Sequence, residues 1–157
     1  WFGNVFDLSE YRGLDATAYL ENVFSEDAGA IRWLDETIEG QPVVLEANGD
    51  SYSDYERVSA MTGLPTVLGW YVHEWLWRGD PADLNVRAED VKQMYTSTDT
   101  NEVLRLLEQY HVTYIFVGSK EKEKYGDALN ELLLQSIGDI VYQDTASGTY
   151  ILQVQDT

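Results

Sequence analysis

The sequence contains no cysteine, few basic residues and no long apolar run. Without cysteine the chain can form no disulfide, no thiolate metal site and no cysteine nucleophile. Lys and Arg total 10 whereas Asp and Glu total 28, so the formal net charge is −18. This charge repels phosphate backbones and anionic lipid surfaces, which excludes nucleic acid as an expected partner. No apolar stretch approaches the roughly 18 residues that a membrane-spanning helix needs.

Several motifs of catalysis and nucleotide binding are missing as well. The chain has no Gly-x-Gly-x-x-Gly, Walker A, Gly-x-Ser-x-Gly or His-Glu-x-x-His pattern. Gly118-Ser119 follows an apolar segment in the manner of a phosphate-binding turn, but residues 120–124 lack the glycines that let backbone amides approach a phosphate. Their alternating charges predict a solvated helical turn instead. A free-standing nucleotide or metal enzyme is therefore the least favoured class.

The chain does contain an alternation of helical and extended patterns. Helices are expected at 25–40, 69–78, 86–95 and 99–110, with a further one capped by Asp127, and strands at 42–47, 58–62, 111–117, 139–143 and 149–154. The last two strands should form an antiparallel hairpin. Together these patterns predict an α/β fold, a three-layer domain whose mostly parallel mixed sheet is flanked by helices.

The domain organisation follows from the same patterns. Residues 1–24 mix aromatic residues with glycines and show no clean period, so we expect an irregular lead-in that packs onto the domain. Residues 25–157 are expected to form a single α/β domain. The sequence begins at Trp1 with no methionine and no signal peptide, and we expect it to be a fragment of a longer protein.

The most unusual segment, residues 48–78, combines tryptophan, tyrosine and ionisable side chains. Three of the five tryptophans lie within eight residues. At about 100° per residue, Trp70, His73, Glu74 and Trp77 fall on one helix face, while Val72 and Leu76 would point toward the core. Aromatic rings cover the apolar faces of sugars and ionisable groups hydrogen-bond hydroxyls, so the segment predicts binding of carbohydrate or another polyhydroxylated ligand. The candidate substrate-binding residues are Tyr52, Tyr55, Arg57, Trp70, His73, Glu74 and Arg78; no catalytic residue is assigned.

Other interpretations of this segment stay open at this point. The tryptophans can fill the core or a contact with another domain. The ionisable residues can form an ordinary ion-pair network that holds a long loop. A metal site built from His73, Glu74, Asp80 and Asp83 is a further alternative, but its pattern is poorly specified, and the prediction is that this domain holds no metal.

Longer stretches of the chain resemble the C-terminal part of the YYY membrane protein family. The resemblance covers nearly the whole chain from about Leu14. It is carried by the segments 27–34, 42–47, 51–70, 73–74, 77–79, 95–99 and 112–118 together with Tyr125. The most specific run is Arg57-Val-Ser, then Thr62-Gly-Leu-Pro-Thr-Val-Leu-Gly-Trp70, then His73-Glu74.

Members of the YYY family are large polytopic proteins of bacteria and archaea that look like membrane glycosyltransferases using lipid-linked sugar donors. The resemblance implies that this chain is the extracytoplasmic C-terminal domain of such a protein, with the transmembrane half of the same polypeptide as its partner. It implies that the 48–78 segment faces that half and holds an acceptor or a sugar-phosphate donor, with Arg57 and Arg78 on a phosphate or carboxylate. The domain alone would be inactive and without cofactor, and any divalent metal would belong to the membrane half.

Two further expectations accompany this resemblance. A more distant likeness is to the soluble domains of oligosaccharyltransferases, in which a strand leads to an aromatic and acidic loop that helps to hold the acceptor; residues 49–55 would take that place. The alternative function is a purely structural module whose aromatic segment packs on its own transmembrane half. An open cleft lined by Trp70, His73 and Glu74 favours binding, whereas a flat apolar patch favours docking.

Overall fold

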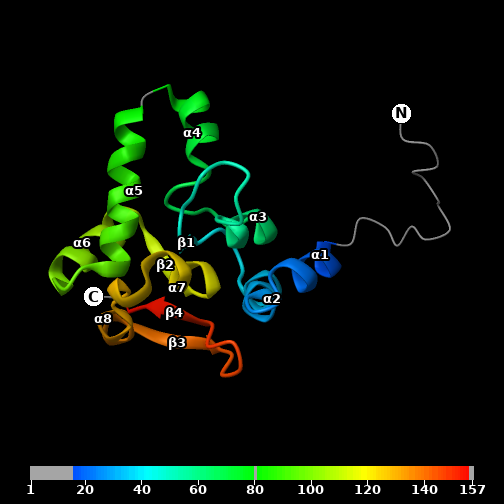
Figure 1. Ribbon diagram of the computed structural model, residues 1–157. Helices are drawn as coiled ribbons and strands as arrows, with labels where there is room; N and C mark the ends of the chain where they lie inside the picture. The colour runs from blue at the N-terminus through cyan, green and yellow to red at the C-terminus, as the bar shows by residue number, and fades with distance from the viewer. Residues whose placement is uncertain (1–15, 80, 156–157) are drawn as a thin grey trace, which may run out of the picture.

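The computed structural model describes residues 16–79 and 81–155, apart from the side chains of residues 16–18 and 78. A mixed sheet lies between two groups of helices (Figure 1). The helices are α1 Ala16–Val23, α2 Ala28–Thr37, α3 Arg57–Thr62, α4 Tyr71–Arg78, α5 Pro81–Thr96, α6 Thr100–Gln109, α7 Ser119–Tyr125 and α8 Glu131–Ile137, with a 3₁₀ turn at Gly126–Ala128. The strands are β1 Val43–Leu45, β2 Val112–Val117, β3 Gly138–Gln143 and β4 Tyr150–Val154.

The sheet confirms the expected α/β class and the C-terminal hairpin. Its strand order is β1-β2-β4-β3. β1 and β2 run parallel, whereas β4 is antiparallel to both β2 and β3. One of the three described strand pairs is therefore parallel, whereas the sequence predicts a mostly parallel sheet. The reason is that the hairpin inserts its second strand beside β2.

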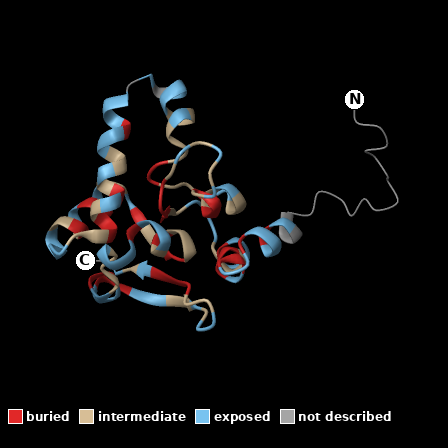
Figure 2. Ribbon diagram, viewed as in Figure 1, coloured by how far each residue is buried: buried red, intermediate tan, exposed pale blue. Residues whose placement is uncertain are grey.

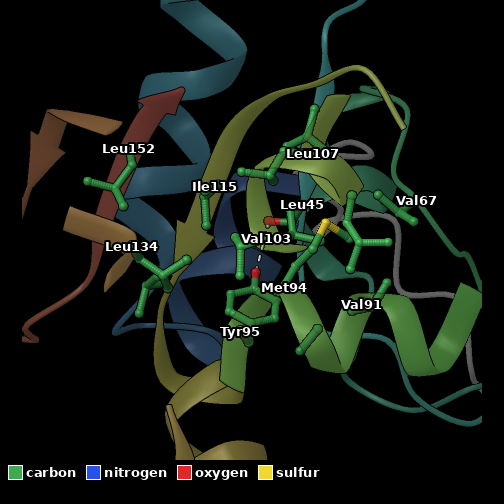
Figure 3. Close-up of a cluster of buried hydrophobic side chains, with 14 of the residues drawn as sticks. Leu45, Val67, Val91, Met94, Tyr95, Val103, Leu107, Ile115, Leu134 and Leu152 are labelled. Carbon is green, nitrogen blue, oxygen red and sulfur yellow. Dashed lines mark hydrogen bonds between the residues drawn. The ribbon is translucent and has the colours of Figure 1, made fainter. Parts of the chain in front are cut away.

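Successive side chains of the strands enter two separate cores, as the twofold period of a strand requires. Ile115 and Leu152 pack with α5, α6 and α8 on one face, and Figure 3 shows this cluster. Phe116 and Ile151 pack with α1, α2 and α3 on the other face. The buried Tyr95 hydroxyl of α5 lies 3.0 Å from the Leu45 carbonyl oxygen and 2.7 Å from that of Phe116. This side chain thereby ties α5 to both parallel strands.

The expected strand at 58–62 is wrong, because this segment forms helix α3. The Glu46 carboxylate accepts hydrogen bonds from the backbone N–H groups of Val58 and Ser59, at 2.8 and 2.9 Å. These are donors that a helix start leaves without intrahelical partners. Gly63 ends the helix in the left-handed conformation, with φ of 71°. The capping hydrogen bonds to Glu46, which follows β1, thus outweigh the preference of Val58 for a strand.

Smaller differences concern the ends of helices. α1 occupies residues 16–23, part of the segment expected to be irregular, and residues 1–15 lie outside the described part of the chain. α2 begins after Asp27 rather than after Ser25. Asp127 belongs to the 3₁₀ turn, and α8 is capped by Asn130, whose side chain accepts a hydrogen bond from the Leu133 N–H.

Helix α4 and the first half of α5 extend away from the sheet (Figure 1). Since α4 contacts α5 rather than the sheet, Val72 and Leu76 do not dock on the core as expected. They are 42% and 72% exposed. Across residues 16–79 and 81–155, none of the helices combines the length and the apolar character that a membrane span requires.

Candidate functional site

The candidate site is formed by the segment that follows the carboxyl end of β1. In parallel sheets, ligands bind beyond the carboxyl ends of adjacent strands. Here β1 leads into the loop 46–56 and then into α3 and α4, while the end of β2 leads into α7. The Gly49 N–H donates a 2.7 Å hydrogen bond to Glu56 Oε1, which closes the loop on itself. The Val72 N–H donates to Ser51 Oγ at 3.2 Å and joins the loop to α4.

A hollow of about 550 Å³ lies between α3 and α4. This volume falls within the range of small-molecule sites. It is lined by Glu56, Ser59, Ala60, Gly69, Trp70, His73, Glu74 and Trp77. The four residues that helical spacing places on one face of α4 therefore do share a single cavity. Its walls combine two indole rings with three ionisable side chains, of which His73 and Glu74 were named from the sequence and Glu56 was not.

Aromatic contacts fix one wall of the hollow. The Trp70 and His73 rings lie 5.2 Å apart between centroids, and the Tyr52 ring lies 5.5 Å from Trp70 and 5.0 Å from His73. Trp70 Nε1 donates a 3.2 Å hydrogen bond to the Tyr55 carbonyl oxygen. Tyr52 is 82% exposed and has a φ of 62°, a conformation that non-glycine residues rarely adopt. Tyr52, Trp70 and His73 thus form a preorganised aromatic cluster.

Two buried polar atoms of the hollow have no hydrogen-bond partner. Among the described residues only four buried side-chain N or O atoms lack one, and Glu56 Oε2 and His73 Nδ1 are two of them. Both residues line the hollow. A buried polar atom without a partner costs roughly 1–3 kcal/mol, which a bound ligand group can recover. The orphaned atoms therefore indicate where a polar ligand would bind.

Glu56 lines the hollow but is not among the candidate residues named from the sequence. It is 3% exposed and starts α3 with a φ of 59°. Burial raises the pKa of Glu56 to about 8, with a further contribution from the nearby Glu46 carboxyl and opposition from the Gly49 hydrogen bond, Lys124 and Arg57. A protonated carboxyl at neutral pH can donate a hydrogen bond as well as accept one. A non-glycine residue held in left-handed backbone conformation is typical of functional sites.

Arg57 does not reach the hollow, so its expected role in ligand binding is wrong. Its side chain is fully buried, and Nε donates to Asp27 Oδ2 at 2.7 Å. Nη2 donates to Glu121 Oε2 at 2.9 Å and Nη1 to Glu121 Oε1 at 3.3 Å. The guanidinium also lies 5.1 Å from the centroid of the Phe116 ring. Arg57 therefore belongs to the alternative that the sequence left open, an ion-pair network that holds the loops.

The carboxylates around Arg57 bind backbone amides of several loops. Glu121 accepts hydrogen bonds from the N–H groups of Ala47 and Gly118, both at 2.9 Å. Asp27 accepts from Ser119 N at 3.0 Å and from Thr149 Oγ1 at 3.0 Å. Burial opposes ionisation of Asp27, but Arg57 and Ser119 together hold its pKa below the usual value. This network joins α2, α3 and α7 to the segments that follow β1 and β2.

The remaining predicted residues lie around the hollow or outside the described structure. Tyr55 does not line the hollow; its ring packs against Lys124 Nζ, 5.3 Å from the ring centroid. Glu74 lines the hollow, and its Oε1 accepts a hydrogen bond from the Gly69 N–H at 3.3 Å. The side chain of Arg78 lies outside the described part of the chain, and Asp80 of the alternative metal site does too. The described residues contain no group of three or more His, Asp or Glu side chains placed to hold a metal ion.

Comparisons with known proteins find similarity at the level of the fold. No protein-family model matches the sequence, and no curated protein matches it. Among solved structures, the fold is similar to the crystal structure of the C-terminal globular domain of an oligosaccharyltransferase from Archaeoglobus fulgidus. The two share 12% sequence identity with a TM-score of 0.51, over 83% of this chain and 97% of that one. At this identity the match establishes a common fold.

Proposed function

We propose that this chain is the extracytoplasmic C-terminal domain of a polytopic membrane protein that resembles a glycosyltransferase using lipid-linked sugars, as in the YYY family. The fold shared with the C-terminal globular domain of an oligosaccharyltransferase supports this context. The resemblance of the run 57–74 to the YYY family supports it independently. The partner is then the transmembrane half of the same polypeptide.

Within this context the domain binds part of a glycan acceptor or donor in the hollow between α3 and α4. The observation that carries this proposal is that Trp70, His73 and Glu74 line an open hollow instead of a flat patch. Indole faces pack on sugar C–H groups, and the unpartnered polar atoms hydrogen-bond hydroxyls. The catalytic groups and any metal belong to the membrane half, so the domain alone turns over no glycosyl donor.

Replacement of Trp77 by alanine tests this binding site. Trp77 lines the hollow and is 88% exposed, so its loss should weaken binding of a saccharide about fivefold to tenfold without unfolding the domain. Leu76 is the matched control, because it is 72% exposed on the same helix and does not line the hollow. Saturation-transfer NMR of neutral and phosphorylated monosaccharides measures the effect. Equal loss for both variants, or no saccharide contact in the unaltered protein, would contradict the proposal.

A second candidate function, docking on the transmembrane half, is favoured by a separate observation. Much of α4 and of the first half of α5 is exposed (Figure 2). On this projecting α4–α5 tip, Val72, Trp75, Leu76 and Val86 are 42%, 45%, 72% and 56% exposed. Apolar side chains gathered at an exposed tip are typical of interaction surfaces. Docking and binding are compatible, because the tip residues and the hollow use different faces of α4.

A photo-crosslinking amino acid tests the docking surface in the full-length protein. With the crosslinker at position 76, we expect a covalent adduct with the transmembrane half, because this side chain is exposed on the α4–α5 tip. The matched control is position 132, where Leu132 is 84% exposed on α8, beyond the opposite end of α5. Equal adduct yields at the two positions would exclude the tip as the docking surface.

A further inference from the structure

The charges around the hollow restrict the ligand that it can hold. Its lining residues include the carboxyl groups of Glu56 and Glu74 and, among the described side chains, no Lys or Arg. Three cations of α3 and α7 are already engaged. Arg57 is enclosed by two carboxylates, and Lys124 donates hydrogen bonds to the carbonyl and side-chain oxygens of Asn48. Lys120 pairs with Glu123 at 2.8 Å.

A phosphate in this hollow would lack the partners that phosphate sites provide. Bound phosphate is normally stabilised by Arg, Lys or several backbone N–H groups at a helix N-terminus. At the start of α3, Val58 and Ser59 N–H already donate to the Glu46 carboxylate. A phosphate would also lie near the Glu74 carboxyl group, and like charges repel one another in a partly dry site. The described side chains that line the hollow therefore disfavour an anionic ligand.

An uncharged hydroxyl group, in contrast, satisfies both orphaned atoms. A hydroxyl donates one hydrogen bond and accepts up to two, so it can pair with Glu56 Oε2 and with His73 Nδ1 in either of their protonation states. A ring that carries several hydroxyls offers a hydrogen-bonding partner to each of these two residues, while its C–H face packs on Trp70 or Trp77. This combination of requirements describes one unphosphorylated sugar ring.

We infer that the hollow binds a neutral sugar ring and rejects sugar phosphates, with Glu56 and His73 as the residues that hydrogen-bond its hydroxyls. This inference rests on the proposed function and narrows it. The part of a glycan that reaches this domain is a neutral sugar unit, and the phosphate of a lipid-linked donor is held elsewhere in the full-length protein.

Pairs of ligands that carry either a methyl group or a phosphate on the C1 oxygen test the inference. Methyl glycosides of glucose, galactose, mannose and N-acetylglucosamine are titrated into the chain by calorimetry beside the corresponding sugar 1-phosphates. At least one neutral glycoside should bind with a Kd on the order of 1 mM, and its 1-phosphate should bind at least tenfold more weakly. A phosphate that binds as tightly as its neutral partner overturns the inference alone. Binding of none of these ligands overturns the proposed function as well.

Two substitutions and one control, all at positions where the fold should be spared, test how the hollow distinguishes a neutral sugar from a sugar phosphate. Ala60→Lys adds a cation at an exposed lining position of α3 and should raise affinity for the sugar 1-phosphate at least fivefold while neutral binding stays within threefold. Ala146→Lys, in the exposed β3–β4 turn, makes the same charge change away from the hollow and should alter neither. His73→Phe keeps a ring but removes Nδ1, and neutral binding should fall at least fivefold. Equal phosphate affinity in the two lysine variants, or full binding by His73→Phe, contradicts the inference.

Discussion

Arg57→Met should cost roughly 3–5 kcal/mol of the free energy of unfolding, the largest effect expected of a single substitution in this site. Asp27 and Glu121 would remain buried without the cation that lies 2.7 and 2.9 Å from them. A buried charge that loses its partner keeps the full cost of its desolvation. For a chain of this length the thermal midpoint should fall by on the order of 10 °C or more. Chemical denaturation followed by circular dichroism measures the loss.

Two comparisons make this prediction specific. Arg105→Met removes an exposed arginine that pairs with Glu102 at 2.8 Å, and its midpoint should hardly change, because exposed ion pairs contribute little. The triple variant that also carries Asp27→Asn and Glu121→Gln should recover part of the stability, since the buried charges are then gone. If Arg57→Met unfolds no earlier than Arg105→Met, the buried network is not what holds these loops.

The stability of the domain should depend on pH because Glu56 holds a proton in the folded state. Its pKa is about 8 in the folded protein against an ordinary value of 4.5, so the folded state keeps a proton that the unfolded state releases. The contribution of the protonated Glu56 carboxyl to the free energy of unfolding is complete below pH 4.5 and is lost as the pH rises through 8. Burial also raises the pKa of Glu46, to about 6, so Glu46 contributes mainly below pH 6. Between pH 6 and 8 the free energy of unfolding should fall by roughly 2 kcal/mol.

Glu56→Gln isolates this contribution. The amide keeps an acceptor for the Gly49 N–H but releases no proton, so the decline between pH 6 and 8 should largely disappear. The variant should match the unaltered protein below pH 4.5 and exceed its stability by a growing margin as the pH rises from 4.5 to 8. Glu39→Gln, which removes an exposed carboxylate, should leave the profile unchanged. Identical profiles for Glu56→Gln and the unaltered protein would show that Glu56 does not hold its proton.

Much of the fold follows from local patterns in the sequence. The apolar segment 111–117 contains β2, and the Asp99–Glu102 pattern marks the start of α6, where the Asp99 carboxylate accepts the Asn101 N–H at 2.9 Å. Such features depend on residues close together in the chain. α3 does not, because its N-terminal N–H groups are capped by Glu46 of the β1 end, 12 and 13 residues away. No local pattern contains that contact.

Part of the candidate site was predictable because its residues also lie close together in the sequence. Trp70, His73, Glu74 and Trp77 share a helix face, and a helical period brings them together in the hollow. Arg57 was assigned to a ligand because the partners that enclose it, Asp27 and Glu121, lie 30 and 64 residues away in the sequence. Glu46 provides one usable indication of buried charge in this region. An acidic residue inside the apolar segment 42–47 suggests a charge within the core.

Resonances of the tryptophan indole N–H groups test the central claim most directly. The chain has five tryptophans. On titration with the neutral methyl glycoside that binds, the indole signals of Trp70 and Trp77 should shift together, because both rings line the hollow. The signal of Trp33, which packs against Tyr142 of β3 and does not line the hollow, should stay in place. Shifts confined to Trp75 or Trp33, or no shift of any indole, would contradict a saccharide site between α3 and α4.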